Sequence, residues 1–183
     1  MPHLELPDRL PCLTIWPEWV YGIVVLGKDI ENRGPWLSER LRRYQGHYIG
    51  IHAGKNIGGK AGSGVSDYSA VRLVIETASD AAHRFGGQRF ENLAVSERGK
   101  IIDSAIQATR ALASSIVVIA RLGAPLPTSY PPRMDGWHAT NQIGWKLKDA
   151  IVLPRPVLCK GLQGIWFAST EQTRFIREQI APR

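Results

Sequence analysis

The chain is poor in cysteine, and this excludes two classes of small protein. Cys12 and Cys159 are its only cysteines, too few and too far apart in the sequence for a disulfide framework or a zinc site. We interpret both as small core residues. The histidines outside the candidate site have no carboxylate or cysteine at metal-ligand spacing, so we predict neither a metal nor a cofactor: His3, His47, His83 and His138.

Long apolar runs and a leader-like start are also missing. No window approaches the ~18 consecutive apolar residues that a membrane span requires. The sequence begins MPHLELPDRL, with acidic residues and prolines where a signal peptide needs a basic start followed by an apolar stretch. We expect a soluble, cytoplasmic protein with no membrane partner.

Acidic residues are outnumbered by basic ones, which points to an anionic partner. Lysine and arginine together number 23 against 16 for aspartate and glutamate, giving a net charge of +7 and a pI of about 9.7. A basic excess of this size fits a polyanion, because neutralising phosphates releases counterions and gives sequence-independent affinity. The glycine-rich stretch KNIGGKAGSG at 55–64 has neither P-loop nor dinucleotide-binding spacing, so it does not predict a nucleotide cradle of those types.

Hydrophobic periodicity and turn residues predict an α+β fold in a single domain, residues 1–183. Strands that do not alternate strictly with helices favour a small, partly closed β-barrel with flanking helices over a doubly wound sheet. Residues 34–46 and 55–64 are predicted loops. The expected elements are a strand at 13–15, a helix from Pro17 to Gly27, strands at 29–33 and 47–54, helices at 68–85 and 97–113, a strand at 115–122, a proline-rich loop at 125–132, alternating strands at 143–157, a strand at 164–169 and a closing helix at 169–180.

Tryptophans are expected both in the core and on the surface. Trp19, Trp145 and Trp166 lie within apolar periodic segments, which is typical of packing residues. Trp16 and Trp137 are the surface candidates. An exposed ring there would contribute roughly 1 to 3 kcal/mol by stacking on a base of single-stranded nucleic acid.

Lys28, Glu31 and Arg33 lie close together in the sequence, just after the first predicted helix, and two interpretations stay open. In one, Lys28 interacts with the negative end of the helix dipole, while Glu31 and Arg33 form an ordinary surface ion pair on one strand face. In the other, apolar neighbours partly desolvate all three. Arg33 then offers a fork to phosphate, Lys28 a point charge and Glu31 a proton acceptor.

Three longer segments follow one another as LTIWPEWVYGIVVLGKDIENR, GHYIGIHAGK and GWKLKDAIVLPRPVLCKGLQGIW. Their order and approximate spacing resemble those of the ASCH domain, a branch of the PUA-like β-barrels. The family pattern is glycine, one residue, lysine, two residues, glutamate, one residue and arginine. Lys28, Glu31 and Arg33 fit this pattern, whereas Leu26 takes the glycine position and Gly27 follows it.

The resemblance implies a PUA-like barrel with a cleft between the first helix and the barrel wall, lined by the lysine, glutamate and arginine. It places His52 and Lys55 at the rim of that cleft, although a lone histidine is more often structural. Lys55 and Lys60 would sit on the glycine-rich loop and could close over a phosphate backbone. Such domains often carry arginine where this chain has Trp16. The helical pair at about 66–113 looks like an insertion relative to the shortest members. Three roles stay open for it: a lid, a partner surface or scaffold.

Two functions follow as hypotheses, because members of this superfamily are associated with RNA and some with hydrolysis. In the first, the chain binds RNA or single-stranded nucleic acid through Arg33, Trp16, His52, Lys55 and Lys60. In the second, it is a hydrolase, either a ribonuclease or an amidohydrolase acting on a modified nucleoside such as acylated cytidine, with Lys28 and Glu31 as catalytic residues. In members similar to acylcytidine amidohydrolases, a threonine three positions after the lysine supplies the nucleophile, and Glu31 takes that position here.

Overall fold

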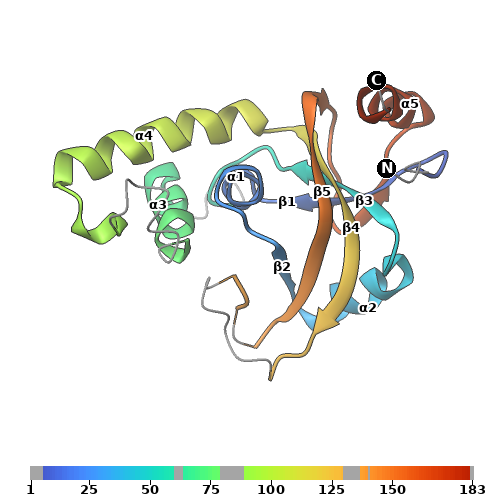
Figure 1. Ribbon diagram of the computed structural model, residues 1–183, viewed down its shortest axis with the longest axis horizontal. Helices are drawn as coiled ribbons and strands as arrows, with labels where there is room; N and C mark the ends of the chain where they lie inside the picture. Colours follow the sequence, from blue (N-terminus) through green and yellow to red (C-terminus); the bar gives the residue numbers. More distant parts are fainter. Residues whose placement is uncertain (1–5, 60–63, 79–88, 130–136, 140, 182–183) are drawn as a thin grey trace.

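The computed structural model describes residues 6–59, 64–78, 89–129, 137–139 and 141–181. Within them the fold is α+β. Six strands form one mixed sheet that curls into a half-barrel, and five α-helices surround it (Figure 1). The strand order is β2-β5-β4-β3-β1-β6, with β1 and β3 parallel and all other neighbours antiparallel. The expectation of a partly closed barrel with flanking helices is therefore confirmed as a curled sheet.

All six strands are expected from the sequence, but three of them are longer than expected. β1 begins at Pro11, two residues before the expected start. β4 runs on through Pro125, and β5 is one strand of 16 residues rather than several alternating strands. Asp149, with φ of 50°, lies in β5 beside a register shift of the β4–β5 pair, so the irregularity bends the strand without ending it. The strands are β1 (Pro11–Ile15), β2 (Ile30–Arg33), β3 (Tyr48–Ala53), β4 (Ser115–Leu126), β5 (Ile143–Leu158) and β6 (Ile165–Phe167).

Two predictions about helices are wrong. Residues 34–46 are not a loop, because a helix begins at Pro35 and a 3-10 turn follows it; seven helical residues are too few to show a clear period. The helix expected at 68–85 ends at Thr77, whose hydroxyl donates to the Leu73 carbonyl in the last turn, and residues 79–88 lie outside the described part. The helices are α1 (Pro17–Val25), α2 (Pro35–Leu41), α3 (Asp67–Thr77), α4 (Val95–Leu112) and α5 (Thr170–Ile180), with 3-10 turns at Arg42–Tyr44 and Phe90–Asn92.

Three apolar clusters join these helices to the sheet. The first fills the hollow of the sheet under α1, and the third lies under α5; α1 and α5 lie on opposite sides of β4 and β5 (Figure 1). The second cluster joins Leu26 and Ile30 to α3 and α4. Gly22 of α1 permits this close packing, since a Cβ there would lie 3.2 Å from Val74 Cγ1. The helical pair is therefore part of the core.

The core position expected for the cysteines is observed for Cys12 and only in part for Cys159. Both cysteines are free; Cys12 is fully buried, and Cys159 is half-buried at the edge of the third cluster. No helix within the described ranges is both long and apolar enough to span a bilayer.

Candidate functional site

A cavity of about 350 Å³ opens where α1, β1 and β2 meet. Its volume lies within the range of about 300 to 1,000 Å³ that is typical of small-ligand sites. We call it the β2 cavity. Its walls come from β1, the first turn of α1, the turn after α1, β2 and the segment before β5: Thr14, Ile15, Trp16, Trp19, Lys28, Glu31, Asn32, Arg33, Ala139 and Gln142.

Lys28 reaches the β2 cavity because the chain reverses immediately after α1. The helix ends at Val25, and Gly27 takes φ of 74°, a conformation that costs glycine nothing. The Lys28 N–H then donates to the Gly22 carbonyl at 2.9 Å. Its Nζ donates to Glu31 Oε2 at 3.0 Å and to the Ile30 carbonyl. The expected helix stop at Gly27 is confirmed, and it fixes the ammonium beside β2.

Glu31 joins the two cations of the β2 cavity. Its Oε2 contacts Lys28 Nζ at 3.0 Å, and its Oε1 contacts Arg33 Nη2 at 2.8 Å. The side chains of Lys28 and Glu31 are only 2% and 6% exposed, and that of Arg33 is 22% exposed. These are not the surface ion pairs of the first interpretation. Removing one partner of a buried pair leaves an uncompensated charge, so all three groups hold each other in place.

Arg33 has donors that its contacts with the described residues do not use. Its Nη2 donates to the Thr14 carbonyl at 3.1 Å in addition to the Glu31 contact. Its Nε is buried and has no hydrogen-bond partner among the described residues. A guanidinium has five N–H donors in a planar fork that suits phosphate oxygens. The β2 cavity therefore presents two cations against one carboxylate, with donors left over.

The tryptophans around the β2 cavity differ in burial. Trp16 is 54% exposed at the mouth, so its expected surface position is confirmed. Trp19 is only half-buried, because one side of its ring lines the β2 cavity and the rest packs on the core. Trp137 is 3% exposed, so its expected surface position is wrong: its ring packs edge-on against Trp19 at 6.5 Å. Trp145 and Trp166 are buried, as expected.

Sequence reasoning missed two residues that build the walls. Asn32 Nδ2 donates to the Trp137 carbonyl at 2.7 Å, and its Oδ1 accepts from the Ala139 N–H at 3.0 Å. This clamp holds the segment before β5 against β2. Thr14 Oγ1 donates to the Leu162 carbonyl at 2.8 Å and accepts from Trp166 Nε1 at 3.0 Å. Asn32 lies between Glu31 and Arg33 in the sequence, which could have drawn attention to it, whereas nothing in the residues next to Thr14 marks it.

Two expected binding residues, His52 and Lys55, do not line the β2 cavity. His52 Nε2 lies 3.1 Å from the Cys159 carbonyl, and its ring packs edge-on against Trp166. Burial lowers the pKa of His52, so the ring is neutral at physiological pH. Lys55 is exposed on the loop after β3, and Lys60 lies outside the described residues. The rim position expected for His52 is not observed, because β3 is an inner strand between β1 and β4.

Glu18 connects the glycine-rich loop to the mouth of the β2 cavity. Its Oε1 accepts from the Gly58 N–H at 3.1 Å, although the residue is only 2% exposed. Burial raises the pKa of the Glu18 carboxyl. The neighbouring Gly59 lies against Trp16: a Cβ there would be 3.0 Å from the ring. The start of the loop therefore supports the exposed indole.

A second recess of about 590 Å³ adjoins the first. It shares Thr14, Trp16 and Arg33 with the β2 cavity and continues along the first turn of α2 and residues 161–164. Trp16 and Arg33 therefore stand between two hollows. This arrangement leaves room on both sides for a chain-like ligand.

The described residues do not offer the groups of a metal centre. No three histidine, cysteine or carboxylate side chains among them lie close enough to hold a metal ion. Burial raises the pKa of the Cys12 thiol to about 12, so it is not a thiolate nucleophile. The β2 cavity can bind an anion and stack a planar ring beside it. No protein-family model matches this chain, and no curated protein matches it.

Proposed function

We propose that this protein is a PUA-like half-barrel of the ASCH type that binds single-stranded RNA, with one nucleotide held in the β2 cavity. The observation that carries the proposal is the convergence of Lys28 and Arg33 around one carboxylate in a cavity that an exposed tryptophan borders. The net charge of +7 supports the same ligand class.

The site is organised before the ligand arrives. Glu31 contacts both cations, so neither side chain has to be ordered at the moment of binding. Arg33 directs its remaining donors to a phosphate, and the nearly buried Lys28 adds positive potential from the cavity wall. Trp16 offers an exposed face to the base, and stacking of this kind contributes roughly 1 to 3 kcal/mol. The adjoining recess accepts the next part of the strand.

Binding of a labelled 12-nucleotide RNA across a salt series tests the proposal. We expect affinity to fall steeply with salt, with a slope of about −0.7 on a log–log plot for each phosphate contact. Arg33→Gln and Trp16→Leu should each weaken binding at least fivefold. Absence of binding, or an affinity that does not change with salt, would contradict the proposal.

Two control variants match these changes in chemistry but lie elsewhere. Arg72→Gln removes an exposed arginine from α3, and Tyr68→Leu removes a 43% exposed aromatic side chain from the same helix. Both should bind RNA as the wild type does. If the controls lose as much affinity as Arg33→Gln and Trp16→Leu, the binding is a general charge effect and the β2 cavity is not the site.

The same cavity supports a second candidate function, hydrolysis of RNA or of a modified nucleoside. The observation that favours it is a nearly buried carboxylate on the cavity wall, beside an ammonium. Glu31 would accept a proton from water, and Lys28 would stabilise the negative charge that develops in the transition state.

Incubating RNA and acylated cytidine with the wild type and with Glu31→Gln separates binding from catalysis. Hydrolysis requires turnover by the wild type that Glu31→Gln abolishes while the variant still binds RNA. Turnover that persists in Glu31→Gln would come from a contaminant. RNA binding without any turnover would leave binding as the function.

A further inference from the structure

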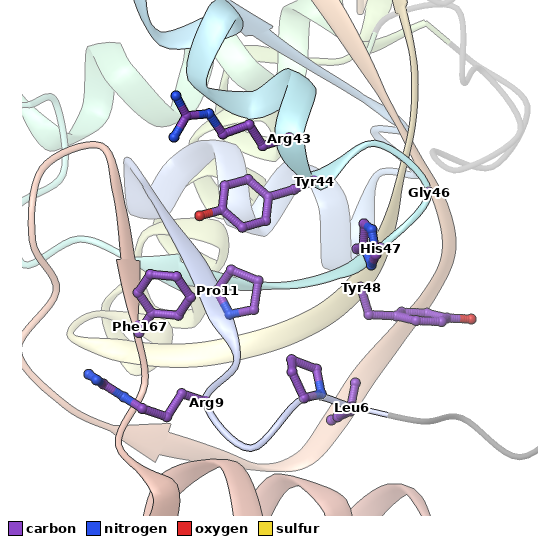
Figure 2. Close-up of a pocket in the computed structure, with 10 residues that line it drawn as sticks. Leu6, Arg9, Pro11, Arg43, Tyr44, Gly46, His47, Tyr48 and Phe167 are labelled. Atoms are coloured by element: carbon purple, nitrogen blue, oxygen red, sulfur yellow. The ribbon is translucent and has the colours of Figure 1, made fainter.

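A third recess, which we call the β6 groove, lies at the opposite end of β1 from the β2 cavity. Its volume is about 610 Å³, and it shares no lining residue with either recess described above. The segment before β1, the link from α2 to β3 and the end of β6 form its walls (Figure 2). The side chains that give it its chemistry are Arg9, Arg43, Tyr44, His47, Tyr48 and Phe167.

Aromatic rings form the floor of the β6 groove. Tyr44 and Phe167 meet edge to face, with 6.4 Å between ring centroids and 65° between planes. Phe167 is the last residue of the edge strand β6, where it pairs with Pro11, and it is 44% exposed. Figure 2 shows the Tyr44 ring turned toward Phe167 and Pro11. An accessible ring held in this way is a surface on which a base can stack.

The described residues that line the β6 groove carry charge of one sign. They include two arginines and a histidine but no carboxylate. Arg9 lies 5.7 Å from the Phe167 ring centroid, and neither Arg9 nor Arg43 forms an ion pair within the described part of the chain. The neighbouring carboxylate of Asp8 instead contacts Arg177 at 3.2 Å. Unpaired guanidinium groups on both sides of an aromatic floor match a base with its flanking phosphates.

The β6 groove and the proposed RNA site lie along the same elements. The first turn of α2 lines the recess next to the β2 cavity, and the 3-10 turn after α2 lines the β6 groove. The chain that enters β6 makes a similar connection, because residues 161–164 line that recess and Phe167, the last residue of β6, lines the β6 groove. Along β1, Thr14 and Pro11 are about 10 Å apart at ~3.3 Å per residue. One strand of a few nucleotides can reach both ends.

We propose that the β6 groove is a second contact site for single-stranded RNA, in which Phe167 and Tyr44 stack a base while Arg9 and Arg43 bind its phosphates. The choice of ligand rests on the proposed function, but the site does not, because none of its residues lines the β2 cavity. The rings favour nucleic acid over an acidic peptide. Such a peptide would pair with the arginines but would have no base to stack on the aromatic rings.

Binding of a 16-nucleotide RNA to two groove variants tests this proposal. Phe167→Leu keeps an apolar side chain but removes the ring, and we expect it to weaken binding of the 16-mer at least fivefold. Arg9→Ala combined with Arg43→Ala should reduce the magnitude of the salt slope by about 1.4, or ~0.7 for each lost phosphate contact. Ultraviolet crosslinking of bound RNA should mark Tyr44, Tyr48 or Phe167.

Matched variants separate this site from the β2 cavity and from general charge effects. Arg72→Ala with Arg174→Ala removes two exposed arginines outside every recess described here, and Tyr68→Leu removes an exposed ring; all three should leave the salt slope and the affinity unchanged. Affinity lost by Arg33→Gln but kept by the groove variants overturns the groove proposal alone. Affinity lost by the groove variants but kept by Arg33→Gln supports the groove and contradicts the β2 cavity.

An acidic peptide serves as the competing ligand. Polyglutamate of matched charge should bind at least tenfold more weakly than the 16-mer and should be insensitive to Phe167→Leu, because it has no bases to stack. Polyglutamate that binds as well as RNA, and loses affinity in the groove variants, would overturn the assignment to RNA.

Discussion

Among the described residues, Glu31 is the one carboxylate that pairs with the cations of the β2 cavity. Glu31→Gln keeps the shape of the side chain but leaves Lys28 and Arg33 without a counter-charge in a poorly hydrated place. We expect the free energy of unfolding to fall by about 3 kcal/mol, at the lower end of the range for a broken buried pair, because Arg33 is partly exposed. Urea denaturation followed by tryptophan fluorescence measures the loss.

Glu39 provides the matched control for Glu31. It also pairs with an arginine at 3.0 Å, but the side chains of Glu39 and Arg42 are 78% and 54% exposed. Glu39→Gln should therefore change the free energy of unfolding by less than about 0.5 kcal/mol. Equal effects of the two substitutions would show that the Glu31 cluster is as well hydrated as a surface pair.

Glu18 should give the stability a pH dependence of known sign. Burial raises its pKa above the usual value of 4.5 in the folded state. The native state therefore holds a proton on Glu18 that the unfolded chain releases, and stability falls as pH rises from about 4.5 through the folded pKa. Glu18→Gln keeps an oxygen for the Gly58 N–H and cannot titrate. Urea denaturation between pH 4 and 8 should show the variant gaining stability relative to the wild type as pH rises; parallel curves would contradict this.

At the residue scale, the sequence predicted the proximity of Glu31 and Arg33 but left two interpretations of their burial open. Strand alternation placed Glu31 and Arg33 on one face, and the structure confirms their contact. Their desolvation depends on Trp19 and on the segment at 137–139, which Asn32 holds from more than 100 residues away. His52 shows the same limit. Its pattern fits a strand end, but the strand lies inside the sheet, so the ring packs on Trp166.

Helix ends offer the clearest test at the scale of single elements. α4 begins after Ala94, where Glu97 Oε2 accepts from the Ala94 N–H at 3.1 Å, but the alanine side chain has no oxygen to accept from the helix. α5 has both halves of this arrangement through Ser169 and Gln172. Ala94→Ser should complete the capping box and raise the free energy of unfolding by about 1 kcal/mol.

The position of the new hydroxyl decides this outcome. Val95→Ser, one residue later and 77% exposed in the wild type, places a hydroxyl inside the first turn, where it caps nothing. Thermal denaturation should therefore show a higher midpoint for Ala94→Ser and no gain for Val95→Ser. A gain from both substitutions would show that any added hydroxyl on this turn stabilises the protein, and that capping is not the cause.

Elements were predictable where their signal is local. The Pro17 start of α1 and the Gly27 stop are both read from adjacent residues, and both are confirmed. α2 was missed because seven residues show little periodicity. The single long β5 was missed because Asp149 and two prolines look like strand ends, and only pairing with β4 holds them in one strand.

At the scale of the whole molecule, the chain leaves the sheet for the helical pair and returns to it at nearly the same place. The Ser114 N–H donates to the Gly54 carbonyl at 3.2 Å, so the excursion of residues 55–113 leaves and re-enters the structure between neighbouring strands β3 and β4. Such an excursion could be an independent unit. Its apolar side chains instead pack on Leu26 and Ile30, the residues that flank the turn carrying Lys28. The cavity wall therefore depends on the helical pair.

This dependence predicts that the helical pair and the half-barrel unfold together. Ile102 of α4 is 1% exposed in the second cluster, so Ile102→Ala should cost about 3 kcal/mol through lost burial and the cavity it leaves. In one cooperative unit, amide hydrogen exchange through global unfolding should quicken by the same factor in α4 and in β4. Leu73→Ala, which truncates a 54% exposed side chain on α3, should leave both unchanged. Faster exchange confined to α3 and α4 would show that the pair opens on its own, and the Lys28 turn would then be free to move without disturbing the sheet.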